Sequence, residues 1–298
     1  MSKIVEVRDL TKSFGHVTAV NQVSFSVEAE KVYGLLGRNG AGKTTVMQII
    51  TAQLFDYSGE VKVFGEAPYE NSHVLSRVCF VKDTQKYPNS YRVCDVFHQA
   101  ALFFPEWDRK YALALAEEFR LPLNRRMKAL SRGMLSAAGA IVGLASRAPL
   151  TIFDEPYLGL DAIARGLFYH RLLEDCAEHP RTIILSTHLI DEVSRLLEHI
   201  LVLDQGKLIL DDEAEALRGR AFTVVGPAAK VDNYTVDKKT LNRELLGGLA
   251  STTVMSDGNG EDRQHAEALG LEVAPVSLQH LIAYLTGEPP ARKAVGVR

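Results

Sequence analysis

The segment at residues 37–44 reads Gly-Arg-Asn-Gly-Ala-Gly-Lys-Thr, and it restricts the possible folds more than any other part of the chain. It fits the pattern G-x-x-x-x-G-K-[ST]. An apolar run at residues 31–36, which predicts a strand, precedes it, and helical spacing at residues 43–53 follows it. In such a unit, backbone N–H groups converge at the helix N-terminus and can hold phosphate oxygens. We therefore predict a phosphate-binding loop, in which Lys43 reaches the β and γ phosphates and the Thr44 hydroxyl holds Mg²⁺.

Strands and helices alternate along most of the chain, which predicts an α/β fold with a parallel sheet covered on both faces. Helices are expected from about residue 162 and from about residue 189. Residues 91–146 contain Ala- and Leu-rich stretches with helical spacing, which indicate a mainly helical insertion. Gly206 marks a hairpin turn into a strand at residues 208–210. The other strands are expected at residues 4–7, 23–27, 60–63, 78–81, 150–153, 182–186 and 200–203.

The character of the sequence changes near residue 220, where glycines become frequent and the strand patterns weaken. Short helices are expected beyond that point at residues 264–269 and 277–285. The domains that we expect are a large α/β domain at residues 1–219, with its helical part at about 88–147, a small α+β domain at 220–287, and a disordered tail at 288–298.

Composition limits the classes of partner and compartment. The chain has 298 residues, 46% of them hydrophobic, and its formal net charge of −3 argues against nucleic acid as a partner. The three cysteines form no CxxC pair, so neither a zinc site nor a disulfide framework is indicated. The start of the chain lacks the apolar stretch of a signal peptide, and residues 134–146 are too short to span a bilayer. We therefore expect a cytoplasmic protein that depends on other chains for any membrane crossing.

Two adjacent acids, Asp154 and Glu155, end the strand expected at residues 150–153, about 110 residues after the loop. At the carboxyl edge of a parallel sheet, Asp154 can bind Mg²⁺ and Glu155 can polarise an attacking water. Adjacent acids at a strand end often form only a solvated loop, but the phosphate loop upstream favours catalysis. His188 follows the next expected strand, at the same edge. A lone histidine is more often structural, and this one is a candidate for contacting the γ-phosphate.

These motifs resemble those of the ABC ATPases and follow each other in the same order as in that family. The resemblance covers about residues 4–215. The resemblance implies a P-loop NTPase core with an antiparallel β subdomain and a helical insertion. Phe14 matches the aromatic residue that stacks on adenine, Glu155 the catalytic glutamate of the Walker B motif, and His188 the switch histidine. The Walker A motif, which the resemblance implies binds ATP, is matched by Gly37, Arg38, Asn39, Gly40, Ala41, Gly42, Lys43, Thr44 and Thr45.

The signature motif departs from the family pattern. Residues 130–134 read Leu-Ser-Arg-Gly-Met where the family has LSGGQ, so Arg132 and Met134 replace a glycine and a glutamine. Ser131 and Gly133, which the resemblance implies meet the γ-phosphate bound to the opposing subunit, are present. Asp161 lies in the match to the D-loop, which belongs to the same composite site. ATP held between two chains is therefore still expected.

A second departure lies in the Q-loop. Asp83 stands where the family usually has glutamine, and Gln85 is close by. A carboxylate at this position can join the outer shell of Mg²⁺ through a water, because Mg²⁺ usually keeps several waters. Asp83 is therefore the candidate metal residue here, and Gln85 is the alternative.

The resemblance implies a subunit that binds and hydrolyses ATP with Mg²⁺ at the cytoplasmic face of the plasma membrane. Its partners would be integral membrane permease subunits and a second ABC ATPase chain, in a homodimer or a heterodimer. The variant signature and the C-terminal extension resemble those of bacterial drug and peptide-antibiotic exporters, particularly a cell-envelope stress branch. A soluble ABC ATPase with a regulatory role and a P-loop kinase are the alternatives. The aromatic cluster at residues 103–107 either receives a helix of the permease or packs in the core.

Overall fold

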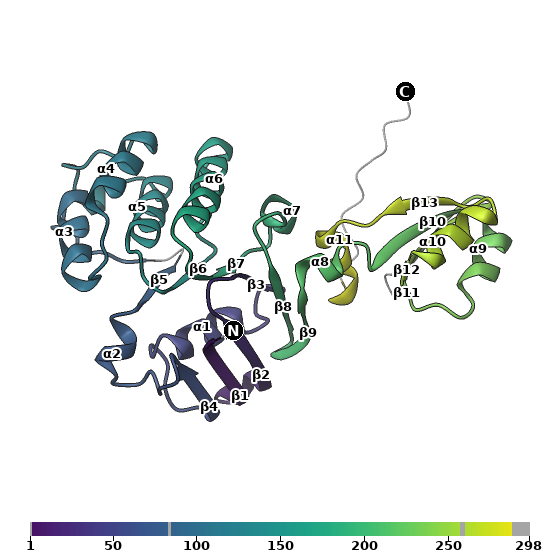
Figure 1. Cartoon of the computed structure of the whole chain (residues 1–298), viewed down its shortest axis with the longest axis horizontal. Coiled ribbons are helices and arrows are strands. Elements are labelled where there is room, and N and C mark those ends of the chain that lie inside the picture. Colours follow the sequence, from purple (N-terminus) through teal and green to yellow (C-terminus); the bar gives the residue numbers. More distant parts are fainter. Residues whose placement is uncertain (1, 83–84, 257–259, 288–298) are drawn as a thin grey trace. The chain divides into compact units, whose positions relative to one another are not determined.

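The computed structural model describes residues 2–82, 85–256 and 260–287 (Figure 1). The chain divides into two compact units. The first consists of Met1–His188 and Leu196–Asp211, and the second consists of Leu189–Arg195 and Asp212–Arg298. The division in the sequence thus falls at Asp211–Asp212, before the boundary expected near residue 219. The segment that directly follows His188 also joins the second unit.

A mostly parallel sheet forms the centre of the first unit, with the strand order β5-β6-β7-β3-β8-β9. Every residue of β3, β6 and β7 is buried, as expected for strands covered on both faces. The pairs β5–β6, β6–β7, β7–β3 and β3–β8 are parallel, which confirms the predicted α/β class. The strands are β3 (Val32–Leu36), β5 (Val78–Lys82), β6 (Leu150–Asp154), β7 (Thr182–Ser186), β8 (His199–Asp204) and β9 (Lys207–Glu213).

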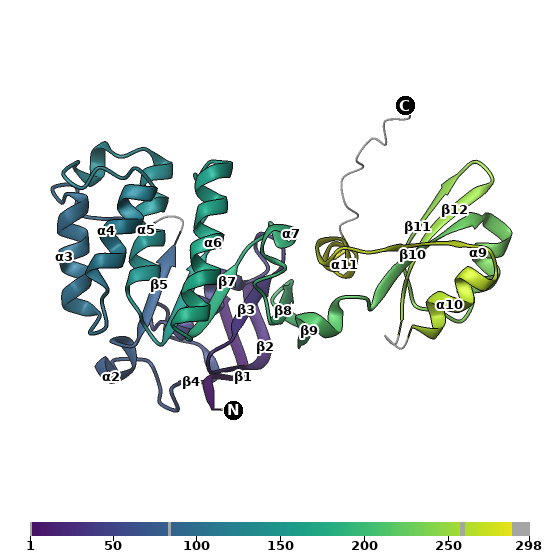
Figure 2. The ribbon, with the colours of Figure 1, turned by 45° about the horizontal axis from the view of Figure 1, so that its top comes forward.

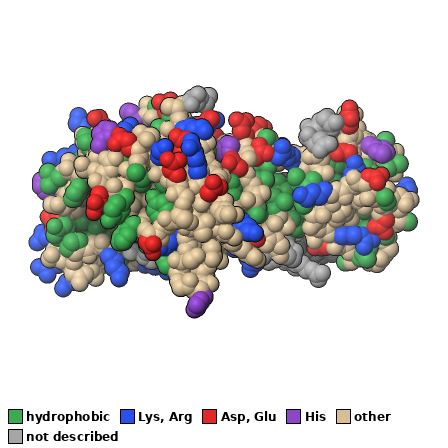
Figure 3. Space-filling model, turned by 90° about the horizontal axis from the view of Figure 1, so that it is seen from below, with side chains coloured by type: hydrophobic (Ala, Val, Ile, Leu, Met, Phe, Trp, Pro, Cys, Tyr) green, Lys and Arg blue, Asp and Glu red, His purple; other side chains and the backbone are tan. Residues whose placement is uncertain are grey.

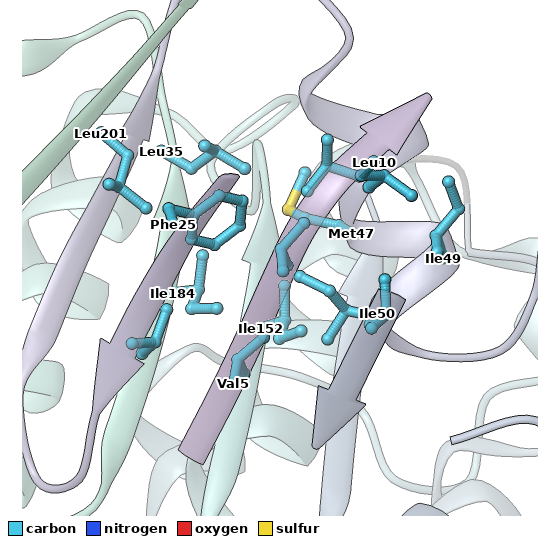
Figure 4. Close-up of a cluster of buried hydrophobic side chains, with 14 of the residues drawn as sticks. Val5, Leu10, Phe25, Leu35, Met47, Ile49, Ile50, Ile152, Ile184 and Leu201 are labelled. Carbon is cyan, nitrogen blue, oxygen red and sulfur yellow. The ribbon is translucent and has the colours of Figure 1, made fainter. Parts of the chain in front are cut away.

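A second sheet of the first unit is antiparallel and has the order β2-β1-β4. It consists of β1 (Lys3–Phe14), β2 (Val17–Glu28) and β4 (Ser58–Val63). Its buried valines, with helix α1 (Lys43–Ile50) and one face of the central sheet, enclose the main core. In Figure 4, Val5 and Phe25 of this sheet point toward Met47 of α1 and Ile184 of the central sheet. The expected antiparallel subdomain is therefore present.

The expected helical insertion contains three longer helices, α3 (Val93–Phe103), α4 (Arg109–Glu118) and α5 (Arg132–Ala145), which lie side by side in Figures 1 and 2. Helix α5 packs closely against strand β6. A Cβ added at Gly143 would lie 2.3 Å from the ring of Phe153, so only glycine permits this approach. No helix in the described part of the chain is long and apolar enough to span a membrane. The other helices of this unit are α2 (Ser72–Leu75), a 3₁₀ turn at Met127–Ala129 and α6 (Ala162–Glu178).

The second unit has its own antiparallel sheet, with the order β11-β12-β10-β13. Along the chain the elements run β-α-β-β-α-β, which is the ferredoxin-like arrangement. Phe222, Val224, Val231 and Val254 are fully buried between the sheet and its two helices. The elements are β10 (Ala221–Pro227), α9 (Ala228–Thr235), β11 (Thr240–Leu246), β12 (Leu249–Met255), α10 (Glu261–Ala268) and β13 (Glu272–Pro275).

Helix α9 was not expected from the sequence. It buries only Val231 and Tyr234, which leaves too little apolar periodicity to identify a helix. The other helices of the unit are α7 (Ile190–Val193), α8 (Ala214–Leu217) and α11 (Leu278–Leu285). Helix α7 is four residues long and begins where a helix was expected, from about residue 189.

Polar contacts hold α7 to the start of α11. The carboxylate of Asp191 accepts hydrogen bonds from the Ser277 hydroxyl at 3.3 Å and from the backbone N–H of Gln279 at 3.4 Å. The Asp191 backbone N–H donates to the Gln279 side chain. Residues 189–195 are therefore fixed by the end of the second unit. On the face drawn in Figure 3, acidic and basic side chains are interspersed.

Candidate active site

The predicted phosphate loop connects β3 to α1, and its glycines have backbone angles that other residues rarely adopt. The φ angles of Gly37, Gly40 and Gly42 are 142°, 83° and 103°. A Cβ at Gly37 would lie 2.1 Å from the Leu203 carbonyl oxygen, and one at Gly42 would lie 2.5 Å from that of Ala19. The loop therefore needs glycine at these positions, both for its turn and for its close packing. Gly42 directly precedes α1, so the loop ends at a helix N-terminus.

Lys43 is 6% exposed and lies along the loop. Its ammonium donates hydrogen bonds to the carbonyls of Gly37 at 2.7 Å and Arg38 at 3.0 Å. Burial lowers the pKa of Lys43, while the nearby charges of Glu155 and Asp154 oppose that shift. The side chain is thus held where its positive charge faces the two acids. Ala41 is buried under the same loop, and Arg38, Asn39 and Gly40 are exposed.

Thr44 and Asp154 are brought together from positions 110 residues apart. The Thr44 hydroxyl donates to the Asp154 carboxylate at 2.8 Å, because α1 starts at the edge where β6 ends. Strand β5 is paired with β6 up to Lys82 and Asp154, so β5 ends at this edge too, and the segment with Gln85 follows it in the sequence. Gln85 in that segment is exposed, and Asp83 lies outside the described residues. The assignment of Asp83 or Gln85 stays a prediction.

The Thr44 hydroxyl and the Asp154 carboxylate suit Mg²⁺, which prefers oxygen ligands and is often bound by one or two carboxylates together with substrate phosphates. Among the described residues, no group of three or more His, Cys, Asp or Glu could hold a metal ion. A bound Mg²⁺ would therefore depend on phosphate oxygens and waters for the rest of its ligands. Thr45, the last residue of the motif, is half-buried in α1.

Glu155 and His188 meet across the ends of β6 and β7. His188 Nδ1 lies 3.0 Å from Glu155 Oε2, and the Glu155 backbone N–H donates to the Ser186 carbonyl. Burial raises the pKa of Glu155, against the opposing effect of the His188 and Lys43 charges. The φ angle of Glu155 is 50°, in the left-handed region. Both side chains therefore lie at the edge that carries Thr44 and Asp154, as predicted.

Tyr157 was not singled out from the sequence, although it contacts both of these residues. Its hydroxyl is hydrogen bonded to Glu155 Oε2, lies 2.8 Å from His188 Nδ1, and accepts from the His188 backbone N–H at 3.0 Å. The residue is 3% exposed. The only signal in the sequence was a large polar ring two positions after Glu155, and the pattern contained nothing that linked it to His188.

The signature segment lies at the start of α5. The Ser131 side chain caps the helix by accepting from the Met134 backbone N–H at 3.2 Å. Gly133 packs on the D-loop, because a Cβ there would lie 2.6 Å from the Gly159 carbonyl oxygen. Asp161 caps α6 by accepting from the Ala164 backbone N–H at 2.8 Å. The signature segment and the D-loop, which were expected to contribute to the same composite site, are therefore in contact with each other.

Phe14 lies at the end of β1 and is 48% exposed, with the Lys12 ammonium 5.2 Å from its ring centroid. The aromatic cluster at residues 103–107 is divided between surface and interior. Phe103 is 69% exposed at the end of α3, next to the exposed Leu102, whereas Trp107 packs on Phe97. Trp107 thus packs against its own helix bundle, and contact of the exposed Phe103 with a permease helix stays a prediction.

Comparison with known proteins identifies the family. A profile of the family described as ABC transporter matches residues 20–158. The chain is 30% identical to the bacitracin transport ATP-binding protein BcrA of Enterococcus faecalis over 228 residues, which are 75% of this chain and 74% of that protein. This chain belongs to the ATP-binding proteins of ABC transporters. The chain is also 30% identical to Nod factor export ATP-binding protein I of Burkholderia lata over 260 residues, which are 85% of this chain and 84% of that protein.

Solved structures of ABC ATP-binding subunits share the fold. One described as the ATP binding subunit of an ABC transporter superposes with a TM-score of 0.65 at 24% identity, covering 70% of this chain and 90% of that chain. A dimeric ATP-binding cassette bound to ADP and Pi superposes with a TM-score of 0.61 at 20% identity, covering 70% of this chain and 98% of that one. These superpositions confirm the P-loop NTPase core. As a member of the ABC family, the subunit binds and hydrolyses ATP.

Proposed function

We propose that this ABC subunit drives export by closing on ATP as a dimer beneath membrane permease subunits, with Glu155 as the base that activates water. The observation that carries the proposal is the Thr44–Asp154 hydrogen bond at 2.8 Å. It joins the phosphate loop to the strand that ends in Glu155, so the predicted phosphate, metal and base residues share one edge of the sheet.

Each of these residues has a separate role in hydrolysis. Lys43 and the loop N–H groups bind the β and γ phosphates, and Thr44 and Asp154 would hold Mg²⁺. Bound Mg²⁺ would supply positive charge next to the phosphate oxygens. Glu155 takes a proton from the attacking water, and its raised pKa makes it a stronger base than an ordinary glutamate. His188, 52% exposed at the side chain, is free to reach the γ-phosphate.

The proposed dimer places Ser131, Gly133 and Asp161 of one chain against the nucleotide of the other. Ser131 and Asp161 are N-caps of α5 and α6, so two helix N-termini with positive dipole ends would approach the γ-phosphate side by side. ATP binding then closes the dimer, and hydrolysis reopens it. The second chain is either identical or a paralogue.

Export is proposed because relatives at 30% identity are named for bacitracin transport and Nod factor export. Leu102 and Phe103 are 68% and 69% exposed, and we assign to this apolar pair the contact with a permease helix. Such a contact would hold the subunit at the cytoplasmic face of the plasma membrane. A purely soluble regulatory role remains the competing function, and it requires no membrane partner.

Mixing two inactive variants tests the dimer. Lys43→Ala cannot bind ATP productively, and Ser131→Asp keeps a capping oxygen on α5 but repels the γ-phosphate of the partner's nucleotide. We expect each variant alone to be nearly inactive. One of the two composite sites stays intact in each mixed dimer, and random association makes about half of the dimers mixed, so the mixture should recover up to about a quarter of the wild-type rate. A mixture that forms heterodimers and stays inactive would refute the arrangement in trans.

Purification from detergent-solubilised membranes tests the partner. We expect an integral membrane chain to co-purify with the wild-type subunit and to be lost from Leu102→Ser/Phe103→Ser. Leu245→Ser/Leu246→Ser provides a matched control, since these leucines are 58% and 82% exposed in the second unit. If no membrane chain is recovered with any of the three proteins, the soluble regulatory role is favoured.

A further inference from the structure

Among the described residues of the site, the Tyr157 hydroxyl is the only side-chain group that contacts both Glu155 and His188. It is hydrogen bonded to Glu155 Oε2, and it lies 2.8 Å from His188 Nδ1 and 3.0 Å from the His188 backbone nitrogen. Tyr157 is 3% exposed and follows Glu155 by two positions, in the turn after β6. All three polar partners of one buried hydroxyl therefore belong to the proposed base and the proposed γ-phosphate sensor.

The number of available protons limits which hydrogen bonds Tyr157, Glu155 and His188 can form together. The Tyr157 oxygen accepts from the His188 backbone N–H and has a single proton to donate. An ionised Glu155 is only an acceptor, so the Tyr157 proton goes to Oε2 or to Nδ1. Nδ1 and Oε2 are 3.0 Å apart, so in the first case the ring proton on Nδ1 completes the Glu155–His188 bond. In the second case Nδ1 and Oε2 would be two acceptors 3.0 Å apart with no proton between them, so the first arrangement fits the observed bonds.

We propose that Tyr157 is a positioning residue, whose hydroxyl fixes the Glu155 carboxylate and the His188 ring relative to each other for hydrolysis. This proposal depends on the roles of Glu155 and His188 proposed above. A base acts efficiently only when its reacting oxygen is held in one place, and a hydrogen bond from a third group commonly provides this. Through the His188 backbone N–H, Tyr157 also holds the segment that carries the ring, so base and sensor are oriented by the same oxygen.

The packing of the Tyr157 ring does not require its hydroxyl. The ring lies edge-on to that of His188, with centroids 5.4 Å apart, and near that of Tyr169 at 6.4 Å. Phenylalanine would preserve both ring contacts and the burial. What phenylalanine would remove is the restraint on a carboxylate whose backbone already has a φ of 50°. The hydroxyl is therefore explained by its three polar contacts.

Tyr157→Phe in the full chain tests the proposal by steady-state ATPase kinetics. We expect kcat to fall about tenfold and the KM for ATP to change less than twofold, because the lost hydrogen bond orients the base and does not bind nucleotide. Tyr33→Phe is the matched control. The Tyr33 hydroxyl is also buried and bonded to one backbone N–H, that of Glu28 at 3.0 Å, but it lies at the start of β3. We expect its kcat to stay within twofold of wild type.

A double-mutant cycle distinguishes positioning from a general loss of stability. If Tyr157 acts through His188, then Tyr157→Phe should reduce kcat less than about threefold in a His188→Ala background. Equal reductions with and without His188, a kcat within twofold of wild type, or a raised KM at unchanged kcat would each overturn the proposal. Glu155→Gln distinguishes a failure of the proposed function from a failure of the role proposed for Tyr157. If that variant retains turnover, the proposed base is wrong, whereas an inactive Glu155→Gln with a fully active Tyr157→Phe rejects only the role of Tyr157.

Discussion

At the scale of single residues, Glu155 is the side chain whose replacement should separate binding from chemistry. Glu155→Gln keeps the size and shape of the side chain, but an amide cannot take a proton from water. We expect ATP affinity close to that of wild type, a turnover at least about a hundredfold lower, and an ATP-bound dimer that accumulates. ATPase assays and size-exclusion chromatography with ATP measure both effects.

The control for this prediction is Glu178→Gln, at the exposed end of α6. It makes the same chemical change away from the site, and its turnover should equal that of wild type. Near-normal hydrolysis by Glu155→Gln would remove Glu155 from its role. The environment of Glu155 explains why the effect should be large, since its side chain is only 13% exposed and lies close to the charges of Lys43 and His188.

At the scale of elements, buried ion pairs connect α6 and β7 to the segment between α5 and β6. Asp175 of α6 is 2% exposed at its side chain, and its carboxylate pairs with Arg147 and, at 2.5 Å, with Arg181. Asp175→Ala would leave two largely buried guanidinium groups without this partner. We expect the free energy of unfolding to fall by about 3–5 kcal/mol, because removing one member of a buried pair leaves uncompensated charge.

Urea denaturation followed by tryptophan fluorescence measures this loss. Trp107 is the single tryptophan of the chain, and it directly precedes Asp108, which pairs with Arg147 at 3.2 Å. Glu118→Ala is the control. It removes a two-point pair with Arg171 that is about one third exposed, and exposed pairs contribute less than about 1 kcal/mol. Equal losses in the two variants would mean that the buried cluster has no special role in stability.

At the scale of the whole molecule, the assigned nucleotide residues lie in the first unit, and the second unit has a core of its own. A chain that ends at Gly219 should therefore bind ATP with an affinity within about threefold of the full chain. Turnover should fall further than affinity, because α7 begins two residues after His188 and truncation removes the contacts of Asp191 with Ser277 and Gln279. Fluorescent-nucleotide titration and ATPase assays measure the two quantities.

Asp191→Ala in the full chain is the companion variant to this truncation. It removes the carboxylate that accepts from Ser277 and Gln279 and keeps the second unit in place. We expect unchanged ATP affinity and a turnover that falls in the same direction as in the truncated chain. A truncated chain that is soluble and folded but cannot bind ATP would contradict the assignment of nucleotide binding to the first unit alone.

The parts of this protein that depend on local pattern could be predicted from its amino-acid sequence. The loop at residues 37–44 needs glycines at particular positions, and buried parallel strands need short apolar runs, so loop, strand order along the chain and α/β class were all predictable. The acids after β6 and the histidine after β7 could be placed at one edge, because carboxyl ends of parallel strands lie together. The helical insertion was recognisable from its long periodic stretches.

Which side chains meet in the site could not be predicted in this way, because it depends on how distant segments pack. The Thr44–Asp154 bond joins residues 110 positions apart, and the contacts of Tyr157 with His188 span 31 positions, so no local pattern encodes them. Helix α9 forms because Val231 and Tyr234 are buried under a sheet, and Phe103 and Trp107 differ only because one faces solvent and the other packs on Phe97. Burial and hydrogen bonding between distant segments depend on the whole packed chain, whereas turn and strand preferences depend on neighbouring residues.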